Sequence, residues 1–360
     1  MSVIFVLPTD TLAGAELTLK RIAKYLCEND YDVHVIFMSK GDNGNWDDIP
    51  ANKVYLKAKR ERFGIFLLLF EILKIRFRGV EFEYSFSSHV HCNAFISLFR
   101  RVGLLTVKKQ ISRESTNIFS CFSGSKLFTF RILYHLYTND LYMIFQTKRM
   151  QNELFDNIPR LSKRKSLVLH NPIDFTDVHR KSFLDKDTQG EFEIVAVGRL
   201  VREKGYEYLL EAFSLLDRKD YTLRIIGSGP LMSELVSLAI NLGIIERVIF
   251  MGFSDNPLPY IRKAKLSVLS SVNEGFPNVL LEMMSVGNRV IATKCTDGID
   301  RLPGITVCGI GSSQQLANAM SSSLSLTEYD AENMKDKMRT YVKRLSPEKY
   351  VGNILSFTEQ

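Results

Sequence analysis

Short apolar runs rich in β-branched and aromatic residues alternate with longer amphipathic stretches along the whole chain. Seven such runs lie in the first half, from SVIFVL to SLVLHN, and six in the second, from EIVAVG to ITVCG. Strand-length runs that alternate with helix-length stretches are typical of parallel sheets joined by helical crossovers. The sequence therefore predicts an α/β fold with two Rossmann-like domains, each a doubly wound parallel sheet.

The boundary between the two halves is a polar stretch, DFTDVHRKSFLDKDTQGEF, that lacks strand signals. We expect an N-terminal domain at residues 1–172, a linker at 173–190 and a C-terminal domain at 191–360, with the last helix packing back on the N-terminal domain. Ligands of doubly wound sheets bind beyond the carboxyl ends of the strands, so the cleft between the two domains is the expected site.

The basic charge of the chain is concentrated in its first half. Residues 1–172 contain 25 Lys and Arg against 16 Asp and Glu, whereas residues 173–360 contain 22 against 24. Such an excess suits nucleic acid, an anionic membrane surface or a polyanionic substrate. No nucleic-acid-binding signature accompanies the charge, so we expect no nucleic acid partner.

From the N-terminal stretch, the apolar runs and the cysteines we expect a cytosolic chain. The first apolar run has no basic region before it and soon meets Pro8, which predicts a strand rather than a signal peptide. No apolar run reaches the ~18 residues of a membrane-spanning helix. The five cysteines are widely spaced and contain no C-x-x-C, so they predict neither a disulfide framework nor a zinc site.

Two strand-to-helix turns of the second half are suited to an anion. In GRLVREKG, Arg199 and Lys204 flank a loop that follows Gly198 and opens a helix, where backbone N–H groups favour a phosphate. The alternative is that both cations are ordinary surface charges. In IIGSGP, Gly227 and Gly229 end a strand, but the third glycine of a dinucleotide fingerprint is missing.

A third turn, SSVNEGFPNVLLEMMSVG, carries two glutamates, Glu274 and Glu282, around a Gly-Phe-Pro sequence. At about 100° per residue, Asn278, Glu282 and Ser285 share one stripe of the predicted helix, away from its core face. One interpretation is that both carboxylates reach one polyhydroxylated ligand through charge-assisted hydrogen bonds. The other is that Glu282 faces solvent and Glu274 only suits a helix N-terminus.

The ordered series GRLVREKG, IIGSGP and NEGFPNVLLE resembles the family-four glycosyltransferases of the GT-B fold, whose E-x7-E motif would be Glu274 to Glu282. LAGAELTLKRIAKYL, IFQTKRMQNELF and LHNPID extend the resemblance over the first half, although AGAE departs from the commoner G-G-A-E. The family implies catalytic roles for Glu274, Arg199 and Lys204. It implies donor binding at Gly14, Gly198, Arg199, Lys204, Gly227, Glu274, Gly275, Phe276, Pro277, Asn278 and Glu282.

The resemblance also implies a mechanism. Arg199 and Lys204 would hold the donor diphosphate, Glu282 the ribose hydroxyls and Glu274 the hydroxyls of the sugar. The donor would be a UDP-sugar carrying a hexose or N-acetylhexosamine, transferred with retention of configuration and without metal or another cofactor, because the two cations can offset the charge of the leaving UDP. The D-x-D triplets at Asp30 and Asp185 are interpreted as turns.

The acceptor side of the site is less defined by the sequence. Many relatives place a histidine where this chain has Arg113 and Glu114, at the end of KKQISREST. His89 and His91, after the preceding strand, are further candidates to face the cleft, or are polar loop residues.

One stretch, KRERFGIFLLLFEILKIRFRG at residues 59–79, places an apolar run between basic clusters. It is either an interfacial membrane helix or a buried Rossmann helix with basic ends. With the basic excess, it fits a peripheral enzyme at the inner face of the plasma membrane that uses a lipid-linked saccharide acceptor in O-antigen or capsule synthesis. The alternatives are a sugar-nucleotide epimerase and a non-catalytic saccharide-binding or scaffold protein of the same fold.

Overall fold

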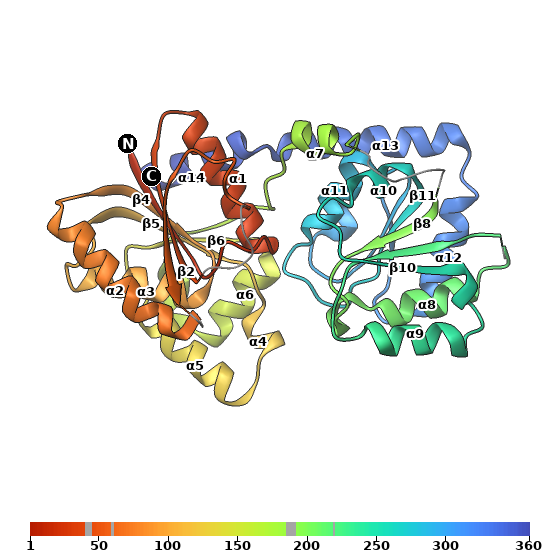
Figure 1. Ribbon diagram of the computed structural model, residues 1–360, viewed down its shortest axis with the longest axis horizontal. Coiled ribbons are helices and arrows are strands. Elements are labelled where there is room, and N and C mark those ends of the chain that lie inside the picture. Colours follow the sequence, from red (N-terminus) through yellow and green to blue (C-terminus); the bar gives the residue numbers. More distant parts are fainter. Residues whose placement is uncertain (40–44, 59–60, 185–191, 219) are drawn as a thin grey trace. The chain divides into compact units, whose positions relative to one another are not determined.

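A computed structural model describes residues 1–39, 45–58, 61–184, 192–218 and 220–360. The chain divides into two compact units, which we call the N-terminal unit (Met1–Pro172 with Pro347–Gln360) and the C-terminal unit (Ile173–Ser346). Each unit contains one parallel sheet with helices on both faces (Figure 1). The prediction of two Rossmann-like parallel-sheet domains is confirmed.

The N-terminal sheet has the order β3-β2-β1-β4-β5-β6-β7. Its strands are β1 (Ser2–Leu7), β2 (Asp32–Ser39), β3 (Asn52–Ala58), β4 (Phe82–Ser87), β5 (Val107–Glu114), β6 (Tyr142–Phe145) and β7 (Ser166–Val168). Its helices are α1 (Gly14–Glu28), α2 (Glu61–Phe77), α3 (Val90–Arg101), α4 (Ile118–Cys121), α5 (Gly124–His135), α6 (Lys148–Asn157), η1 (Pro159–Lys163) and α14 (Pro347–Glu359).

Alternation along β1 builds the two core layers of the N-terminal unit, because successive side chains of a strand point to opposite faces. Val3, Phe5 and Leu7 pack with α1 and with Tyr350 of α14. Ile4 and Val6 pack on the other face, with α2 and α3. The last helix of the chain thus belongs to the N-terminal unit.

The C-terminal sheet has the order β10-β9-β8-β11-β12-β13. Its strands are β8 (Phe192–Val197), β9 (Leu223–Ile226), β10 (Val248–Gly252), β11 (Ala264–Leu269), β12 (Val290–Thr293) and β13 (Thr306–Cys308). Its helices are α7 (Phe175–Lys181), η2 (Arg202–Lys204), α8 (Tyr206–Ser214), α9 (Met232–Asn241), η3 (Ile245–Arg247), α10 (Leu258–Lys263), α11 (Asn278–Val286), η4 (Ile299–Arg301), α12 (Ser313–Leu324), α13 (Glu328–Val342) and η5 (Lys343–Leu345).

The stretch predicted as a linker, residues 173–190, is largely part of the C-terminal unit. It contains α7, which contacts α10 and α11 and buries Val178 in their shared core. The Asp174 side chain caps α7 by accepting from the Asp177 backbone N–H at 2.9 Å. Polar residues that predict a linker here form a capped short helix. Residues 185–190, including the D-x-D triplet at Asp185, lie outside the described residues.

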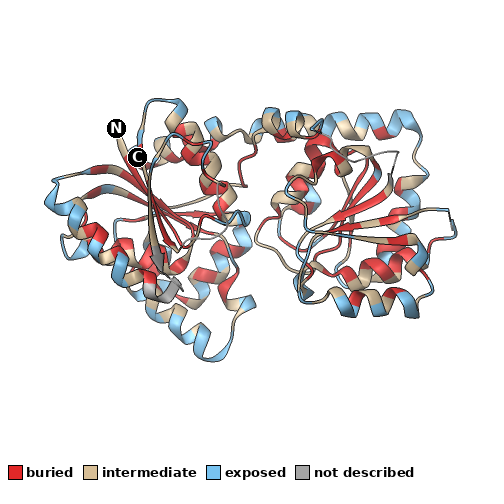
Figure 2. Ribbon diagram, in the orientation of Figure 1, coloured by how far each residue is buried: buried red, intermediate tan, exposed pale blue. Residues whose placement is uncertain are grey.

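In each sheet the strand order reverses at one place, between β1 and β4 and between β8 and β11. Loops that leave these adjacent strands in opposite directions open a crevice at the carboxyl edge of the sheet. Both strand pairs are buried, and exposed residues gather on the outer helices (Figure 2). None of the helices in the described part of the chain combines the length and apolar character needed to cross a bilayer.

Candidate functional site

The glycines after β8 and β9 let the loops at the carboxyl edge of the C-terminal sheet touch. A methyl group on Gly227 would lie 1.9 Å from the Gly198 oxygen, and one on Gly229 would lie 2.4 Å from the Leu200 oxygen. The Leu200 N–H donates to the Ser228 oxygen at 2.9 Å, which joins the two loops. The IIGSGP sequence therefore serves loop packing at the edge of the sheet, whatever ligand binds there.

The central cluster of this edge joins the loops that follow β8 and β11. The Lys204 ammonium lies 2.5 Å from Glu274 Oε1, and the Ser271 hydroxyl donates to the same oxygen at 2.9 Å. Both charged side chains are only 18% exposed. Two residues that the sequence placed in separate turns are thus held together at the β8–β11 switch point.

Backbone contacts fix the position of this cluster. Gly205 follows Lys204 in the left-handed conformation, with φ of 59°, and a methyl group there would lie 2.4 Å from the Ser270 oxygen. The Ser270 hydroxyl donates to the Lys204 oxygen at 2.9 Å, and the Val272 N–H donates to the Glu203 oxygen at 2.8 Å. Gly205 is therefore required for the close approach of the two loops.

The Gly275-Phe276-Pro277 segment leads into α11. The Thr296 hydroxyl donates to the Gly275 oxygen at 2.7 Å, and Phe276 and Pro277 are buried. Asn278 is the first residue of α11, and Glu282 lies one turn further on, half-buried. Ser285, predicted on the same stripe away from the core face, is instead fully buried, and its hydroxyl is satisfied by donating to the Leu281 oxygen.

Two ionisable groups near the cluster have raised pKa values. Burial, and after it the negative charge of Glu274, raises the pKa of the Cys295 thiol to about 12. The same two causes raise the pKa of Tyr206, whose hydroxyl donates to the Gly198 oxygen at 3.1 Å. Both groups are neutral at physiological pH. Arg199, the second predicted phosphate ligand, is exposed on the loop after β8.

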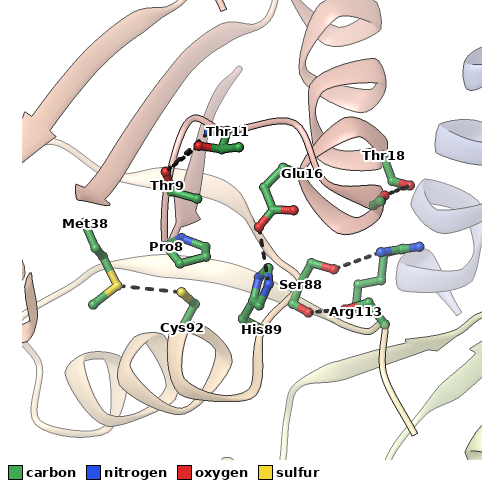
Figure 3. Close-up of polar contacts among 12 residues, drawn as sticks. Pro8, Thr9, Thr11, Glu16, Thr18, Met38, Ser88, His89, Cys92 and Arg113 are labelled. Carbon is green, nitrogen blue, oxygen red and sulfur yellow. Dashed lines mark hydrogen bonds and ion pairs between the residues drawn. The ribbon is translucent and has the colours of Figure 1, made fainter. Parts of the chain in front are cut away.

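In the N-terminal unit, the histidine candidates lie just beyond β4, at its switch point. His89 Nε2 is 3.3 Å from Glu16 Oε1 of α1, as Figure 3 shows. Burial lowers the pKa of His89 to about 3, with smaller contributions from His91 and Arg113, and burial lowers the pKa of His91 to about 4. Both imidazoles are therefore neutral near pH 7 and are weak proton acceptors.

The predicted donor glycine of this unit, Gly14, is the exposed first residue of α1. Its carbonyl accepts a hydrogen bond from the Thr18 hydroxyl at 3.0 Å. It follows β1, and so it lies with His89 at the β1–β4 switch point.

Arg113 and Glu114 are neighbours at the end of β5, both are buried, and they have different hydrogen-bond partners. Arg113 donates to the Ser88 hydroxyl at 2.8 Å (Figure 3). It also donates to Asn171, and the two contacts tie together loops at the carboxyl edge.

Glu114 instead lies inside the unit. It accepts from the hydroxyls of Tyr137 and Tyr134 at 2.8 and 3.0 Å and from the amide of Asn93 at 3.3 Å. It is 3% exposed, and burial raises its pKa to about 7. This environment is that of an internal packing group and differs from the cleft-facing role expected from the sequence.

Several residues of the two edges were not found from the sequence. Ser271, Tyr206 and Thr296 hold the loops of the C-terminal edge through hydroxyl groups, and Glu16 approaches His89 in the N-terminal unit. Ser271 lies three residues before Glu274, in the same SSVNEGFPNVLLEMMSVG stretch. A serine at the end of a strand does not by itself indicate a functional residue. In the described part of the chain, no group of three or more His, Cys, Asp or Glu side chains is arranged to hold a metal ion.

The cluster of Lys204, Glu274 and Ser271 lies in a segment that matches a known protein family. Residues 191–325 match the family of group 1 glycosyl transferases. Gly198, Lys204, Glu274 and Glu282 all lie in this segment, which falls within the C-terminal unit.

Two relatives extend the comparison. The chain is 31% identical over 200 residues to the N-acetylgalactosamine-N,N'-diacetylbacillosaminyl-diphospho-undecaprenol 4-alpha-N-acetylgalactosaminyltransferase of Campylobacter jejuni, covering 55% of this chain and 54% of that enzyme. It is 33% identical over 136 residues to the lipopolysaccharide core biosynthesis glycosyltransferase LpsE of Rhizobium meliloti, covering 37% and 38%. The chain thus spans about half or less of the length of these relatives.

A solved structure matches the whole chain. Anabaena HepE, in complex with UDP and glucose, superposes with a TM-score of 0.78 at 17% identity, over 99% of both chains. The predicted GT-B fold is confirmed by this likeness. The family match and both relatives named above carry the description of glycosyltransferases.

Proposed function

We propose that this protein is a retaining, metal-independent glycosyltransferase that moves a hexose or N-acetylhexosamine from a UDP-sugar to a lipid-linked saccharide. The observation that carries the proposal is the cluster of Lys204, Glu274 and Ser271 at the β8–β11 switch point, inside the segment that matches the glycosyl transferase family. A cation and a carboxylate side by side suit a ligand that carries both phosphates and hydroxyl groups.

The donor would lie across the loops after β8 and β11. Lys204 and the exposed Arg199 bind its diphosphate, Glu274 binds hydroxyls of the transferred sugar, and Glu282 binds the ribose hydroxyls. The backbone of Gly275, Phe276, Pro277 and Asn278 surrounds the sugar and phosphates, and Gly198 and Gly227 allow close approach of the backbone.

Chemistry follows from positioning and charge. The bond between the anomeric carbon and the phosphate oxygen breaks while the acceptor oxygen bonds to the same face of that carbon. The proton of the acceptor hydroxyl passes to the departing phosphate, so no enzymic base is needed. Lys204 and Arg199 stabilise the negative charge that develops on UDP, a role that a divalent ion fills in other enzymes.

The acceptor is assigned by analogy with the relatives. The Campylobacter enzyme is named for a diphospho-undecaprenol saccharide and the Rhizobium enzyme for the lipopolysaccharide core. By analogy, this chain works at the inner face of the plasma membrane, from the cytoplasm, in O-antigen or capsule synthesis. The basic excess of residues 1–172 supports a diphosphate-bearing acceptor.

The testing experiment starts with donor binding. Thermal shifts are measured with UDP-, GDP- and ADP-sugars, without metal, on the wild-type protein, on Glu282→Ala and on Glu246→Ala, a control at an exposed site in η3. A ligand that binds only the folded state raises the melting temperature by mass action. We expect one UDP-sugar to stabilise the wild type and the control but not Glu282→Ala.

Turnover then separates the candidate functions. The donor found is incubated with undecaprenyl-diphosphate-linked saccharides, with and without EDTA, and the product anomer is determined by NMR. Product with the donor's configuration, formed equally in EDTA, supports the proposal. Conversion of the UDP-sugar without an acceptor indicates an epimerase, and a folded protein that binds no nucleotide sugar indicates a non-catalytic role.

A further inference from the structure

The outer face of α2 carries an unusual amount of exposed apolar surface. Phe66 is 72% exposed, Phe70 61% and Phe77 88%, and Leu67 beside them is 41% exposed. A surface helix of a globular protein normally presents polar residues to water. Figure 2 shows exposed residues along this helix, and a contiguous exposed apolar patch of this kind marks an interaction surface.

These side chains form one stripe. At about 100° per residue, Phe66, Phe77, Phe70, Lys74 and Leu67 fall within an arc of about 100° on the helix. We call this arc, with Arg76 and Arg78 at its C-terminal end, the α2 face.

The opposite side of α2 is fixed to the sheet, so the α2 face cannot turn inward. Leu68 and Ile72 are fully buried against residues of β1 and β2. A methyl group on Gly64 would lie 2.9 Å from Met38 of β2, which shows how closely the helix approaches the strand. The sequence offered a buried Rossmann helix or an interfacial helix, and α2 has the features of both.

The charges of the α2 face have one sign. Lys74, Arg76 and Arg78 are exposed, and the one acid described between Phe66 and Gly79, Glu71, is buried and hydrogen-bonded to Lys74 at 2.9 Å. The next exposed acid along the chain is Glu81, beyond the helix.

We propose that the α2 face binds an anionic lipid surface, with α2 lying in the plane of the interface. Aromatic side chains on one face of a helix, flanked by basic residues, insert their rings at the headgroup boundary while the cations meet anionic headgroups. A second copy of the chain is a poor occupant, because a two-fold contact would place Lys74, Arg76 and Arg78 against their own counterparts. The inference deepens the proposed function, on which it partly rests, by naming the surface that meets the membrane.

The test is flotation of the full chain with vesicles, without donor or acceptor. Vesicles of phosphatidylcholine alone are compared with vesicles containing roughly one-third phosphatidylglycerol. The variants are Phe66→Ser/Phe70→Ser/Phe77→Ser and Arg76→Gln/Arg78→Gln. The matched control is Phe253→Ser, because Phe253 is 73% exposed but lies in the C-terminal unit.

We expect the wild type and the control to float with the anionic vesicles and to bind neutral ones far less. The triple serine variant should lower the partition coefficient at least about a hundredfold, since burial of each Phe is worth about tenfold or more. Each removed arginine should lower it about fivefold, and added salt should weaken the binding further.

Two results would overturn the inference: wild type that stays unbound with anionic vesicles, or a triple variant that floats as well as the wild type. Dimerisation of the wild type that the serine variants abolish, without vesicle binding, would assign the face to a copy of the chain instead. All variants should keep the melting temperature and the UDP-sugar thermal shift of the wild type, since these side chains are exposed. Failure of vesicle binding with an intact donor shift would therefore reject the docking surface and leave the proposed function standing.

Discussion

Replacement of Gly205 by alanine tests how the two loops of the donor-side cluster are joined. Gly205 has φ of 59°, a left-handed conformation that destabilises a residue with a side chain by roughly 1–2 kcal/mol. The added methyl would also lie 2.4 Å from the Ser270 oxygen, whereas ordinary contact begins near 3.4 Å. That oxygen is backbone and cannot rotate away, and overpacking of this kind costs roughly 1–3 kcal/mol. We expect Gly205→Ala to lower the free energy of unfolding by about 2–5 kcal/mol.

Gly243 provides the matched control. It lies in the same unit with φ of 66°, and a methyl group there would meet nothing within 4 Å. Gly243→Ala should therefore lower the free energy of unfolding only through the left-handed backbone conformation, by roughly 1–2 kcal/mol. The difference between the two variants isolates the contact between the loops.

Urea titration measures both variants, with the free energy extrapolated linearly to water. Far-UV circular dichroism is the suitable probe, because the single tryptophan, Trp46, lies in the N-terminal unit. UDP-sugar binding should weaken at least about tenfold in Gly205→Ala, because Lys204 and Ser270 move apart, and should stay unchanged in Gly243→Ala. Equal destabilisation by the two substitutions would refute the reasoning, since it would mean that the loops yield without cost.

Three further outcomes are expected. Glu282→Ala should weaken UDP binding at least about tenfold in calorimetric titration, as loss of hydrogen bonds to a charged group does, while Glu246→Ala leaves it unchanged. Glu274→Gln should reduce transfer at least about a hundredfold while UDP affinity changes little, and an equal loss of both would contradict the assigned role. Glu114 has a folded pKa of about 7 against 4.5, so the folded state holds the extra proton and stability should fall as pH rises through this window, by up to about 1.4 kcal/mol per pH unit. Urea titrations across that range should show this slope in the wild type and not in Glu114→Gln.

Two parallel sheets could be predicted from the sequence because strand-length and helix-length segments alternate along most of the chain, although β3 follows β2 with no helix in the described residues between them. The linker was misjudged because local polarity says little about a short helix. In α7 one capping side chain, Asp174, and one buried residue, Val178, suffice to hold the helix on α10 and α11.

The donor-side residues were accessible from the sequence because strand-to-helix turns have strong local signals. The hydroxyl contacts of Ser271 and Thr296 were not, since they depend on which loops meet in space. The contrast between Arg113 and Glu114 had a usable signal, because adjacent residues of a strand point to opposite faces. That alternation says nothing of exposure, and both side chains are buried.

The contact of Lys204 with Glu274 bears on how the donor would be received. The long side chain of a lysine has many rotamers, and ordering it at a phosphate site costs conformational entropy. Glu274 holds the Lys204 ammonium at 2.5 Å, and Ser271 in turn orients Glu274. An incoming diphosphate can take over the ammonium without ordering it anew, and the carboxylate is then placed to accept from sugar hydroxyls. On this argument Glu274→Gln, which keeps an oxygen acceptor for Lys204 and Ser271, should disturb the lysine less than Glu274→Ala does, and UDP affinity should separate the two variants.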